Sequence, residues 1–504
     1  MHKRVIVIGA GVSGLSAGTY ACMNGYDVAL FEARPHAGGV LTPWSRAGYT
    51  ISPSVDELLG SAPSHPLFSI WNELGALDGV SVVDHAERVR VEREDGHQFA
   101  MYCDLKRLRK ELISASPKDR DLLSEFVGGI RRCASVAPIQ KKPNELMGPL
   151  ERFGRGIRRL ATTPIMNRWG RVSVSEFCHD LEDPFLREAL PLGLGRPDLP
   201  MLYGMMVLAA MSRKAAGTPV GESHRIAEAI GRRFTSLGGS LHTRSQVSRI
   251  LVEEGRAIGI RLADGREHRA DHIVSACDGH TALFDWFEGI EIAEAARRPY
   301  AELCPVPPIL LISIGIRQAI DEIPQTAAGF SFHIPEPVTI DKRKFTRLTI
   351  HVRGSASGLC PPGATLLNVA IDSSFERWKK LSADPAAYEA EKREVGEQVV
   401  SAVLQRFPDV EGAVDMLDVA TPTTWHRITN NWRGSISGWM LTPKSLDVSV
   451  AKEIPGISGF HMIGHWTDPG GGLPAAALSA RHIVQILCRK DRKRFHAAAH
   501  GSPG

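Results

Sequence analysis

The feature that most limits how this chain can fold is a glycine motif directly after its first apolar run. Residues 5–8 read V-I-V-I, and residues 9–14 read G-A-G-V-S-G, which is the spacing G-x-G-x-x-G. A helix-like stretch follows over 15–23, a second apolar run occupies 28–31, and Glu32 ends it. Strand, glycine turn, helix, strand and acid in this order predict a βαβ unit of a doubly wound α/β sheet.

Each glycine of the motif has a separate physical role in binding a dinucleotide. Gly9 permits the tight turn from strand to helix, Gly11 lets the backbone approach a pyrophosphate, and Gly14 lets the helix pack against the strand. Val12 and Ser13, between Gly11 and Gly14, are expected cofactor contacts beside the N-terminus of the helix that follows. The free N–H groups and the positive dipole end there attract the pyrophosphate.

The predicted site continues beyond the second strand. A carboxylate at Glu32 can accept hydrogen bonds from ribose hydroxyls, and it disfavours a 2′-phosphate. The glycine pair Gly38–Gly39 follows so soon that a second close approach of the backbone to the same cofactor is expected. FAD extends past this point towards its flavin ring, and NAD does not need it, so FAD is the predicted cofactor. The residues expected to contact it here are Glu32, Ala33, Arg34, Gly38, Gly39 and Val40.

The same region shows a resemblance to a known family. The segment EARPHAGGVLTPWSRAGYT at 32–50 resembles the flavoproteins related to phytoene desaturase, carotenoid isomerase and retinol saturase, which share a fold with the amine oxidases. The resemblance covers essentially the whole chain. Where that superfamily normally has Arg after the glycine pair, this chain has Val40. The resemblance implies an α/β fold in which a discontinuous Rossmann-type FAD-binding domain has an inserted α+β substrate-binding domain.

The pattern of apolar residues along the chain can be divided in the same way. Three strand-like runs occupy 245–280, where the resemblance places the backbone of Val247 at the adenine and Ala276 near the cofactor. A plain strand residue is the alternative for Val247. We expect an FAD-binding domain from 1–85, 215–280 and 455–490, a substrate-binding domain from a mainly helical segment 86–214 and a mixed segment 281–454, and a basic tail over 491–504.

A glycine triplet near the C-terminus predicts a second loop of the same kind. A short strand-like run precedes it, and Pro474 suits the first turn of the helix that follows, because a missing N–H costs nothing there. A flexible linker would not lie between a buried strand and an amphipathic helix. The resemblance implies that Gly464 approaches the pyrophosphate and that Gly472, Leu473 and Pro474 lie beside the flavin.

No motif indicates a metal site or a serine nucleophile. HMIGH at 461–465 has the i, i+4 spacing of a zinc helix but lies on a predicted strand and lacks the glutamate. The flavin is therefore expected to perform the redox step, a hydride transfer from a C–H bond with loss of a proton from the neighbouring carbon. His465 is either a base near neutral pH or a structural histidine, Trp466 an aromatic wall, and Asp468 an acid–base group or a cap of the loop.

The segment 48–60 departs from the pattern of the family. Relatives commonly carry Phe-Asp-x-Gly here, and this chain has Ser-Pro-Ser at 52–54 followed by Asp56. The segment faces the flavin in the family. Ser54 is therefore a candidate substrate contact, and Asp56 is a second acid–base candidate, with an exposed carboxylate at a helix start as the alternative.

Three further residues are candidates for contact with the substrate. The segment 423–441 resembles the Asn-Trp-x-Gly-Ser segment of the family, so Trp432 and Trp439 either line or support the cavity or pack in a core. Met205 lies in the eleven-residue apolar run 201–211. That run is either a buried helix or a wall that faces an apolar ligand or a membrane surface.

Composition limits the partners. The 60 basic and 56 acidic residues among 504 give no argument for nucleic acid. Eight cysteines without a C-x-x-C pair indicate a reducing, cytoplasmic setting. No apolar run reaches the ~18 residues of a membrane span. The basic run RKDRKR at 489–494 is either solvated or a peripheral contact with an anionic membrane.

The sequence leaves several functions open. The first is a desaturase or oxidase acting on an apolar, polyene or isoprenoid-like substrate, and the second is an isomerase or saturase that uses reduced FAD. An amine oxidase-like enzyme is a further option. A prenyl-binding protein without FAD is disfavoured by the intact glycines and Glu32. The electron acceptor stays open.

Overall fold

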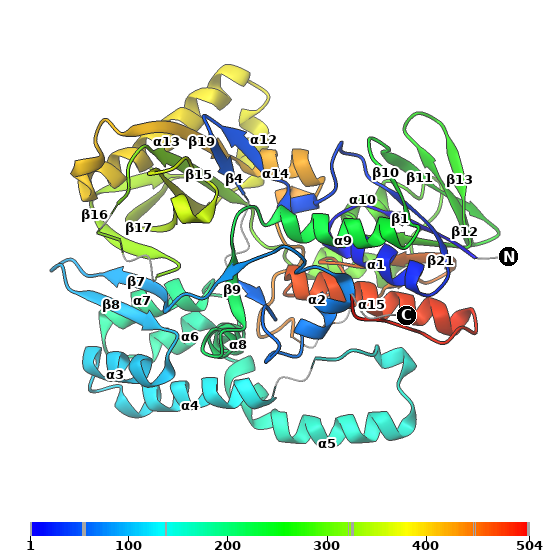
Figure 1. Cartoon of the computed structure of the whole chain (residues 1–504), viewed down its shortest axis with the longest axis horizontal. Coiled ribbons are helices and arrows are strands. Elements are labelled where there is room, and N and C mark those ends of the chain that lie inside the picture. Colours follow the sequence, from blue (N-terminus) through cyan, green and yellow to red (C-terminus); the bar gives the residue numbers. More distant parts are fainter. Residues whose placement is uncertain are drawn as a thin grey trace.

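Two separate β-sheets organise the chain (Figure 1). The computed structural model describes residues 3–52, 57–136, 139–320, 322–323, 327–446, 448 and 450–500, with only the backbone at 134–136, 155 and 157–161. The first sheet lies on the right of Figure 1 with the C-terminal helix beneath it. The second sheet lies at the upper left, above a group of helices.

The first sheet is built on the βαβ unit that the glycine motif predicts. Strand β1 (Arg4–Ile8) pairs in parallel with β2 (Asp27–Phe31) on one side and with β14 (His272–Ser275) on the other, and helix α1 spans Val12–Met23. The strand order is β10-β2-β1-β14-β21-β12-β11. Its other strands are β10 (Ser240–His242), β11 (Val247–Glu253), β12 (Arg256–Leu262), β13 (Glu267–Arg269), β20 (Glu453–Ile454) and β21 (Ile457–Met462).

Alternating residues of β1 are buried on opposite faces of this sheet. Val5 and Val7 belong to a core formed with α1, α9 (His224–Ser236) and α15 (Gly472–Lys490). Ile6 and Ile8 belong to a second core with β11, β12 and α10 (Gly279–Phe284). A parallel sheet covered on both faces accounts for the continuous apolar run that the sequence shows there.

The second sheet is mostly antiparallel, in the order β19-β15-β18-β17-β16-β7-β8. Helix α13 (Pro385–Arg406) contributes Val395, Val399 and Val403 to the core on one face. The apolar runs at 309–316, 347–352 and 365–371 all lie in strands of this sheet. Its strands are β7 (Glu87–Glu92), β8 (Gln98–Tyr102), β15 (Ile309–Ile316), β16 (Phe330–Ile340), β17 (Arg343–Gly354), β18 (Thr365–Asp372) and β19 (Val414–Ala420).

The segment expected to be mainly helical, 86–214, therefore begins with a hairpin. β7 and β8 join the edge of the second sheet and pack against the helices that follow. The helices that follow β8 are α3 (Leu105–Ala115), α4 (Arg120–Val136), α5 (Pro149–Ile165), α6 (Val174–His179), α7 (Pro184–Leu194) and α8 (Met201–Met211).

Among the described residues of the whole chain, none of the helices is both long enough and apolar enough to cross a bilayer.

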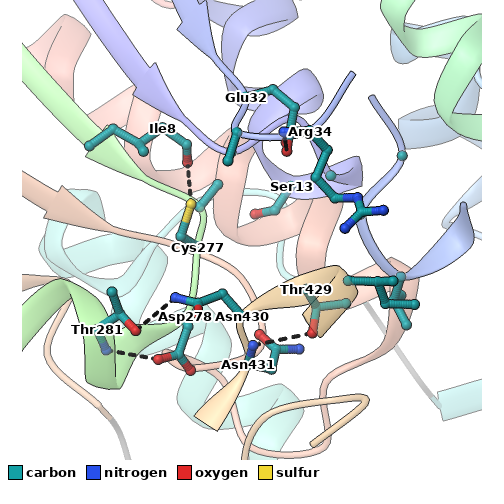
Figure 2. A pocket seen from close by; sticks show the side chains of 18 of the residues that line it. Ile8, Ser13, Glu32, Arg34, Cys277, Asp278, Thr281, Thr429, Asn430 and Asn431 are labelled. Atoms are coloured by element: carbon teal, nitrogen blue, oxygen red, sulfur yellow. Dashed lines mark hydrogen bonds between the residues drawn. The ribbon is translucent and has the colours of Figure 1, made fainter. Parts of the chain in front are cut away.

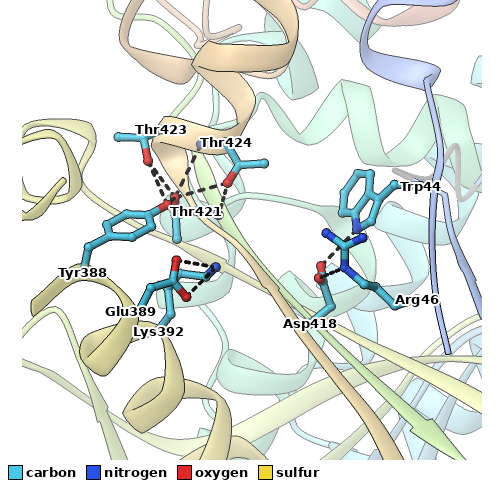
Figure 3. A network of polar contacts seen from close by, with 9 residues as sticks. All are labelled: Trp44, Arg46, Tyr388, Glu389, Lys392, Asp418, Thr421, Thr423 and Thr424. Atoms are coloured by element: carbon cyan, nitrogen blue, oxygen red, sulfur yellow. Dashed lines mark hydrogen bonds and ion pairs between the residues drawn. The ribbon is translucent and has the colours of Figure 1, made fainter. Parts of the chain in front are cut away.

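Polar contacts join the N-terminal part of the chain to the second sheet (Figure 3). The hairpin of β3 (Trp44–Arg46) and β4 (Tyr49–Ile51) reaches Asp418 of β19, where Trp44 Nε1 donates over 3.0 Å and Arg46 Nε over 3.2 Å. Nearby, the hydroxyl of Tyr388 on α13 lies 2.6 Å from Thr421 Oγ1, the N-cap of α14 (Pro422–Thr429). These contacts fix α14, which borders the site described below.

The basic run after α15 is partly held against the protein. Asp491 accepts hydrogen bonds from Tyr26 over 3.0 Å and from His272 over 2.9 Å, if that ring nitrogen bears the proton. Lys493 Nζ donates to the carbonyl oxygens of Asn24 and Gly25, at 3.2 and 3.0 Å. The expectation of a merely solvated tail is wrong for these residues, because they close the end of α15 onto the first sheet.

Candidate functional site

A cavity of about 390 Å³ lies where the parallel strands of the first sheet end. Ile8 ends β1, Phe31 ends β2, and Ala276 follows β14, and all three line it. His465 and Trp466, which follow β21, also line it. Ligands of doubly wound folds bind at the carboxyl ends of the strands, so the topology alone points to this cavity.

The glycines of the first motif differ in what surrounds them. A Cβ added at Gly14 would lie 1.8 Å from the Gly9 carbonyl oxygen, so helix and strand touch there. Gly9 has a φ of +93°, and a Cβ there would lie 2.6 Å from Cys277 Sγ. A Cβ at Gly11 would meet no atom nearer than 3.9 Å, yet Gly11 lines the cavity. Gly11 therefore keeps space free for a ligand, whereas Gly9 and Gly14 serve the chain's own packing.

Glu32 is fixed above this turn by two backbone groups. Its Oε2 accepts a hydrogen bond from Ala10 N over 2.7 Å, and its Oε1 accepts from Arg34 N over 2.9 Å. An ionised carboxylate has about four acceptor positions, so capacity remains for ribose hydroxyls. Arg34 in turn donates from Nη1 to the carbonyl oxygen of Arg427 on α14, over 3.3 Å. The open space at Gly11 and this oriented acid fit the adenosine and pyrophosphate of FAD.

The N-termini of α1 and α15 meet beside the cavity. Ser13 Oγ lies 3.4 Å from the carbonyl oxygen of Ala476, and Ser13 and Ala476 both line the cavity. Gly464 N donates to Ser479 Oγ over 3.0 Å, and a Cβ on Gly464 would lie 3.3 Å from Ser13 Oγ. Two helix N-termini thus direct N–H groups and positive dipole ends to one place, which suits a pyrophosphate.

His465 is neutral at neutral pH in this environment. Burial lowers its pKa from the usual value to about 4. Its Nδ1 is buried and has no hydrogen-bond partner within the part of the chain that the structure describes. The expectation of a base tuned to neutral pH must be corrected, because a group with so low a pKa is a weak proton acceptor.

Trp466 belongs to an aromatic cluster. Its indole is almost fully buried and lies at a ring distance of 4.9 Å from Trp439 and 6.3 Å from both Tyr300 and Trp432. Trp439 Nε1 donates to the Trp466 carbonyl oxygen over 2.9 Å. Trp439 is fully buried and does not line the cavity. It supports the cavity wall from behind, as part of a small aromatic core with Trp466.

Asp278 connects this wall to the first sheet. Its Oδ2 accepts from Thr281 N over 2.8 Å (Figure 2). Its Oδ1 accepts from Trp432 N, also over 2.8 Å. The neighbouring Asn431 accepts from Trp466 Nε1 at 3.4 Å. Burial raises the pKa of Asp278, although both backbone hydrogen bonds oppose the shift. A single buried carboxylate thus fixes the loop that holds the indole of Trp466.

The structure brings most of the predicted cofactor residues together. Figure 2 shows Glu32 and Arg34 on one side of the cavity and Asp278 and Thr281 on the other. Contact with FAD stays a prediction for each residue. Those that line the cavity are Gly9, Gly11, Val12, Ser13, Glu32, Ala33, Arg34, Gly38, Gly39, Val40, Val247, Ala276 and Leu473. The catalytic candidates His465 and Trp466 line it as well.

Other predicted residues lie elsewhere. Gly14, Gly464, Gly472, Pro474 and Trp432 do not line this cavity. Ser54 and Asp56 lie outside the described residues, so the segment 48–60 stays a prediction at these positions.

Two expected site residues are placed differently by the structure. Asp468 does not line the cavity. It accepts from Thr467 Oγ1 over 3.3 Å and lies 4.0 Å from Lys452 Nζ, so it serves the loop. Met205 is fully buried in the helical core around Trp169 and does not reach the cavity, so the buried-helix alternative is correct for α8.

Several lining residues were not predicted. Cys277, Asp278 and Thr281 directly follow the predicted strand β14, so its carboxyl end was the signal that could have identified them. Burial raises the pKa of the Cys277 thiol, which donates to the Ile8 carbonyl oxygen over 3.2 Å. No local signal marks Trp286 or Arg427. No group of three potential ligands that could hold a metal ion occurs among the residues described.

Comparison with known proteins agrees with this geometry. Prolycopene isomerase of Daucus carota is 22% identical over 94% of this chain and 78% of its own length. Phytoene desaturase (neurosporene-forming) of Rhodobacter capsulatus is 26% identical over 98% of this chain and 96% of its own length. Among solved structures, a putrescine oxidase variant superimposes with a TM-score of 0.62 over 97% of this chain and 99% of its own, at 12% identity, which shows the shared fold.

The family match covers nearly the whole chain. The family described as flavin containing amine oxidoreductase matches residues 12–488. That range includes the second sheet, every strand of the first sheet except β1, and most of the residues that line the cavity. The chain therefore belongs to the flavin-containing amine oxidoreductase family and is an FAD-dependent enzyme.

Proposed function

We propose that this enzyme transfers a hydride between FAD and an apolar substrate of the polyene or isoprenoid class. The relatives named as phytoene desaturases and prolycopene isomerases match over nearly all of the chain, which supports this substrate class. The second sheet and helices α3–α8 would form the substrate-binding domain. The eight cysteines are free thiols, which fits a cytoplasmic location.

Each part of the cofactor can be matched to particular residues at the cavity. Glu32 and Val247 would hold the adenosine, Gly11 and Ser13 the pyrophosphate, and Leu473 would lie beside the flavin. When bound, FAD supplies a hydride acceptor or donor. The protein supplies orientation and a dry wall.

The observation that best supports an apolar substrate is the absence of a free charge at the aromatic end of the cavity, among the residues that the structure describes there. His465 is neutral, and Trp466 is an indole wall. The buried carboxylate of Asp278 already accepts two backbone hydrogen bonds. An ammonium substrate entering beside these residues would find no available carboxylate among those described at this end, and an unpaired buried charge is costly.

Anaerobic mixing of the FAD-loaded enzyme with candidate substrates tests the proposal. Bleaching of the flavin by polyenes or isoprenoids, with none by amines, is the expected result. Bleaching by amines alone would overturn it. The prolycopene isomerase relatives support a second reading, an isomerase or saturase that uses reduced FAD. That reading predicts polyene turnover without net bleaching, and only after prior reduction.

A variant of His465 tests its contact with the reacting groups. His465→Ala opens the wall beside Trp466, so the substrate would be held less closely against the flavin and we expect flavin reduction to slow by about tenfold or more. FAD should stay bound, because the adenosine and pyrophosphate contacts are made by other residues. Stopped-flow absorbance measures the rate, and an unchanged rate would exclude a role for His465 in the reaction.

A further inference from the structure

Helix α5 exposes large apolar side chains at its start. Leu150 is 87% exposed and Phe153 is 70% exposed, the highest values among the large hydrophobic residues described. They are three positions apart, so they lie on one face of the helix. Figure 1 places α5 at the lower edge of the molecule, below and to the right of α4. Among the described elements, its main contacts are with α4 and with the short π-helix Met166–Gly170 that follows it.

The segment that contains α5 is strongly basic. Residues 141–171 include eight Lys or Arg and two Glu, whereas the whole chain has a net charge of only +4. Outside this segment the acidic residues slightly outnumber the basic ones, so the segment accounts for the net positive charge of the chain. Arg152, between the two apolar residues, is exposed. The single acidic residue of α5, Glu151, is neutralised by Lys142 Nζ at 2.6 Å and also accepts from Gly148 N at 2.8 Å.

We propose that α5 docks this enzyme on the surface of an anionic phospholipid bilayer. Leu150 and Phe153 would enter the boundary between headgroups and acyl chains, and the exposed Arg152 would lie at the level of the lipid phosphates, within a segment whose net positive charge attracts them. A protein interface has few charged residues at its centre, whereas the surface of an anionic bilayer attracts positive charge beside exposed apolar residues.

This surface differs from the basic tail that the sequence suggested. Lys490 pairs with Glu453, and Lys493 Nζ donates to backbone carbonyl oxygens in the turn between α1 and β2. No exposed large hydrophobic residue occurs in the described part of that tail. The tail has charge without an apolar anchor, whereas α5 has both. The proposed function explains why docking would be useful, because an apolar substrate dissolves in the bilayer. Docking rests on the proposed function in that respect only.

Flotation of the FAD-loaded full chain with lipid vesicles tests the inference without any substrate. Vesicles of phosphatidylcholine with about 30% phosphatidylglycerol should bind the chain, and pure phosphatidylcholine should bind it about tenfold less. Raising the salt concentration to about 0.5 M should weaken binding, since the Debye length shrinks. The variant L150E/F153E should lose binding to the anionic vesicles by about tenfold or more.

The variant V83E/L237E is a matched control. Val83 and Leu237 are 47% and 38% exposed and lie outside the α5 segment, so this variant should bind vesicles as the unmodified chain does. Both variants should retain FAD and their melting temperature. Equal flotation of L150E/F153E and the unmodified chain, equal binding to neutral vesicles, or no flotation at all would overturn the inference. The inference would also be overturned if the unmodified chain formed a dimer that L150E/F153E dissociates, because Leu150 and Phe153 would then lie in a protein interface.

The outcome is separate from that of the proposed function. A chain that binds vesicles through α5 but bleaches only with amines would refute the apolar substrate and leave the docking surface in place. A chain that bleaches with polyenes but ignores vesicles would do the reverse.

Discussion

The two glycine loops at the cavity look alike in sequence but are needed for different reasons. In the first loop, Gly9 and Gly14 let α1 lie against β1, and Gly11 keeps ligand space free. In the second loop, a Cβ on Gly471 would lie 2.5 Å from Ser437 Oγ and 3.2 Å from His465 Nδ1. Gly470 N donates to the Trp439 carbonyl oxygen over 3.2 Å. The triplet therefore lets a distant segment pack closely, and it does not itself line the cavity.

This difference shows that one loop is determined locally and the other by tertiary contacts. The tightest contact of the first loop is local, Gly14 against Gly9, and looser contacts come from Gly39, Ala276 and Cys277. The partners of the second loop, Ser437 and Trp439, come from the segment after α14. Substitutions in the first loop should therefore act on the βαβ unit and on FAD, and those in the second on the docking of the segment 435–441.

The largest expected effect is that of Gly14→Ala. Its Cβ would lie 1.8 Å from a backbone oxygen, which cannot move without separating α1 from β1. We expect a loss of more than about 3 kcal/mol in the free energy of unfolding, measured by denaturant titration. Gly11→Ala is the control, because its φ of −72° suits alanine and its Cβ has room.

Gly11→Ala should keep the stability of the FAD-free chain and lose FAD affinity by about tenfold or more, since its methyl group enters the cavity. Equal stability losses in the two variants would contradict the distinction drawn between the two glycines.

The next effect is that of Gly471→Ala. Gly471 has φ +48° and ψ −141°, a region that non-glycine residues rarely occupy, and its Cβ would also lie 2.6 Å from the Ser437 carbonyl oxygen. We expect a loss of about 2–3 kcal/mol in unfolding free energy. Gly472→Ala, where a Cβ meets nothing nearer than 3.7 Å, should cost about 1 kcal/mol. Similar losses in both would refute the role assigned to Ser437.

The same contrast explains how far the sequence could predict the structure. Strands β1 and β2, helix α1 and the glycine turn followed from local spacing, and the cavity residues Glu32 and Gly38 with them. The hairpin β7–β8 was missed although E-R-V-R-V-E at 87–92 alternates with a period of two. The core position of Met205 and the low pKa of His465 depend on residues far apart in sequence, so no local pattern identifies them.

Acid pH should act through His465, which packs behind the second loop. Its folded-state pKa of about 4 is below the unfolded value of about 6.5, so between these values the unfolded chain binds more protons. Stability is therefore full above pH ~6.5 and falls as the pH drops towards 4. His465→Gln should reduce the loss between about pH 7 and pH 5 by about 1 kcal/mol, after allowance for partial exposure. Identical pH profiles from denaturant titration would contradict burial of a neutral ring.

Asp278 holds the loop around Trp432 against the end of β14, and its substitution should have the smallest effect on global stability. An asparagine side chain accepts through a single oxygen, so Asp278→Asn should lose one of the two backbone hydrogen bonds and release the loop around Trp432 at a cost of about 1 kcal/mol. Arg433, in this loop, is exposed and has a φ of +53°. Tryptic cleavage after Arg433 should therefore accelerate, and the visible spectrum of bound FAD should change as Trp466 loses its support. Asp285→Asn, on the exposed end of α10, should leave both readouts unchanged. Equal cleavage rates in the two variants would show that the loop around Trp432 holds its position without this carboxylate.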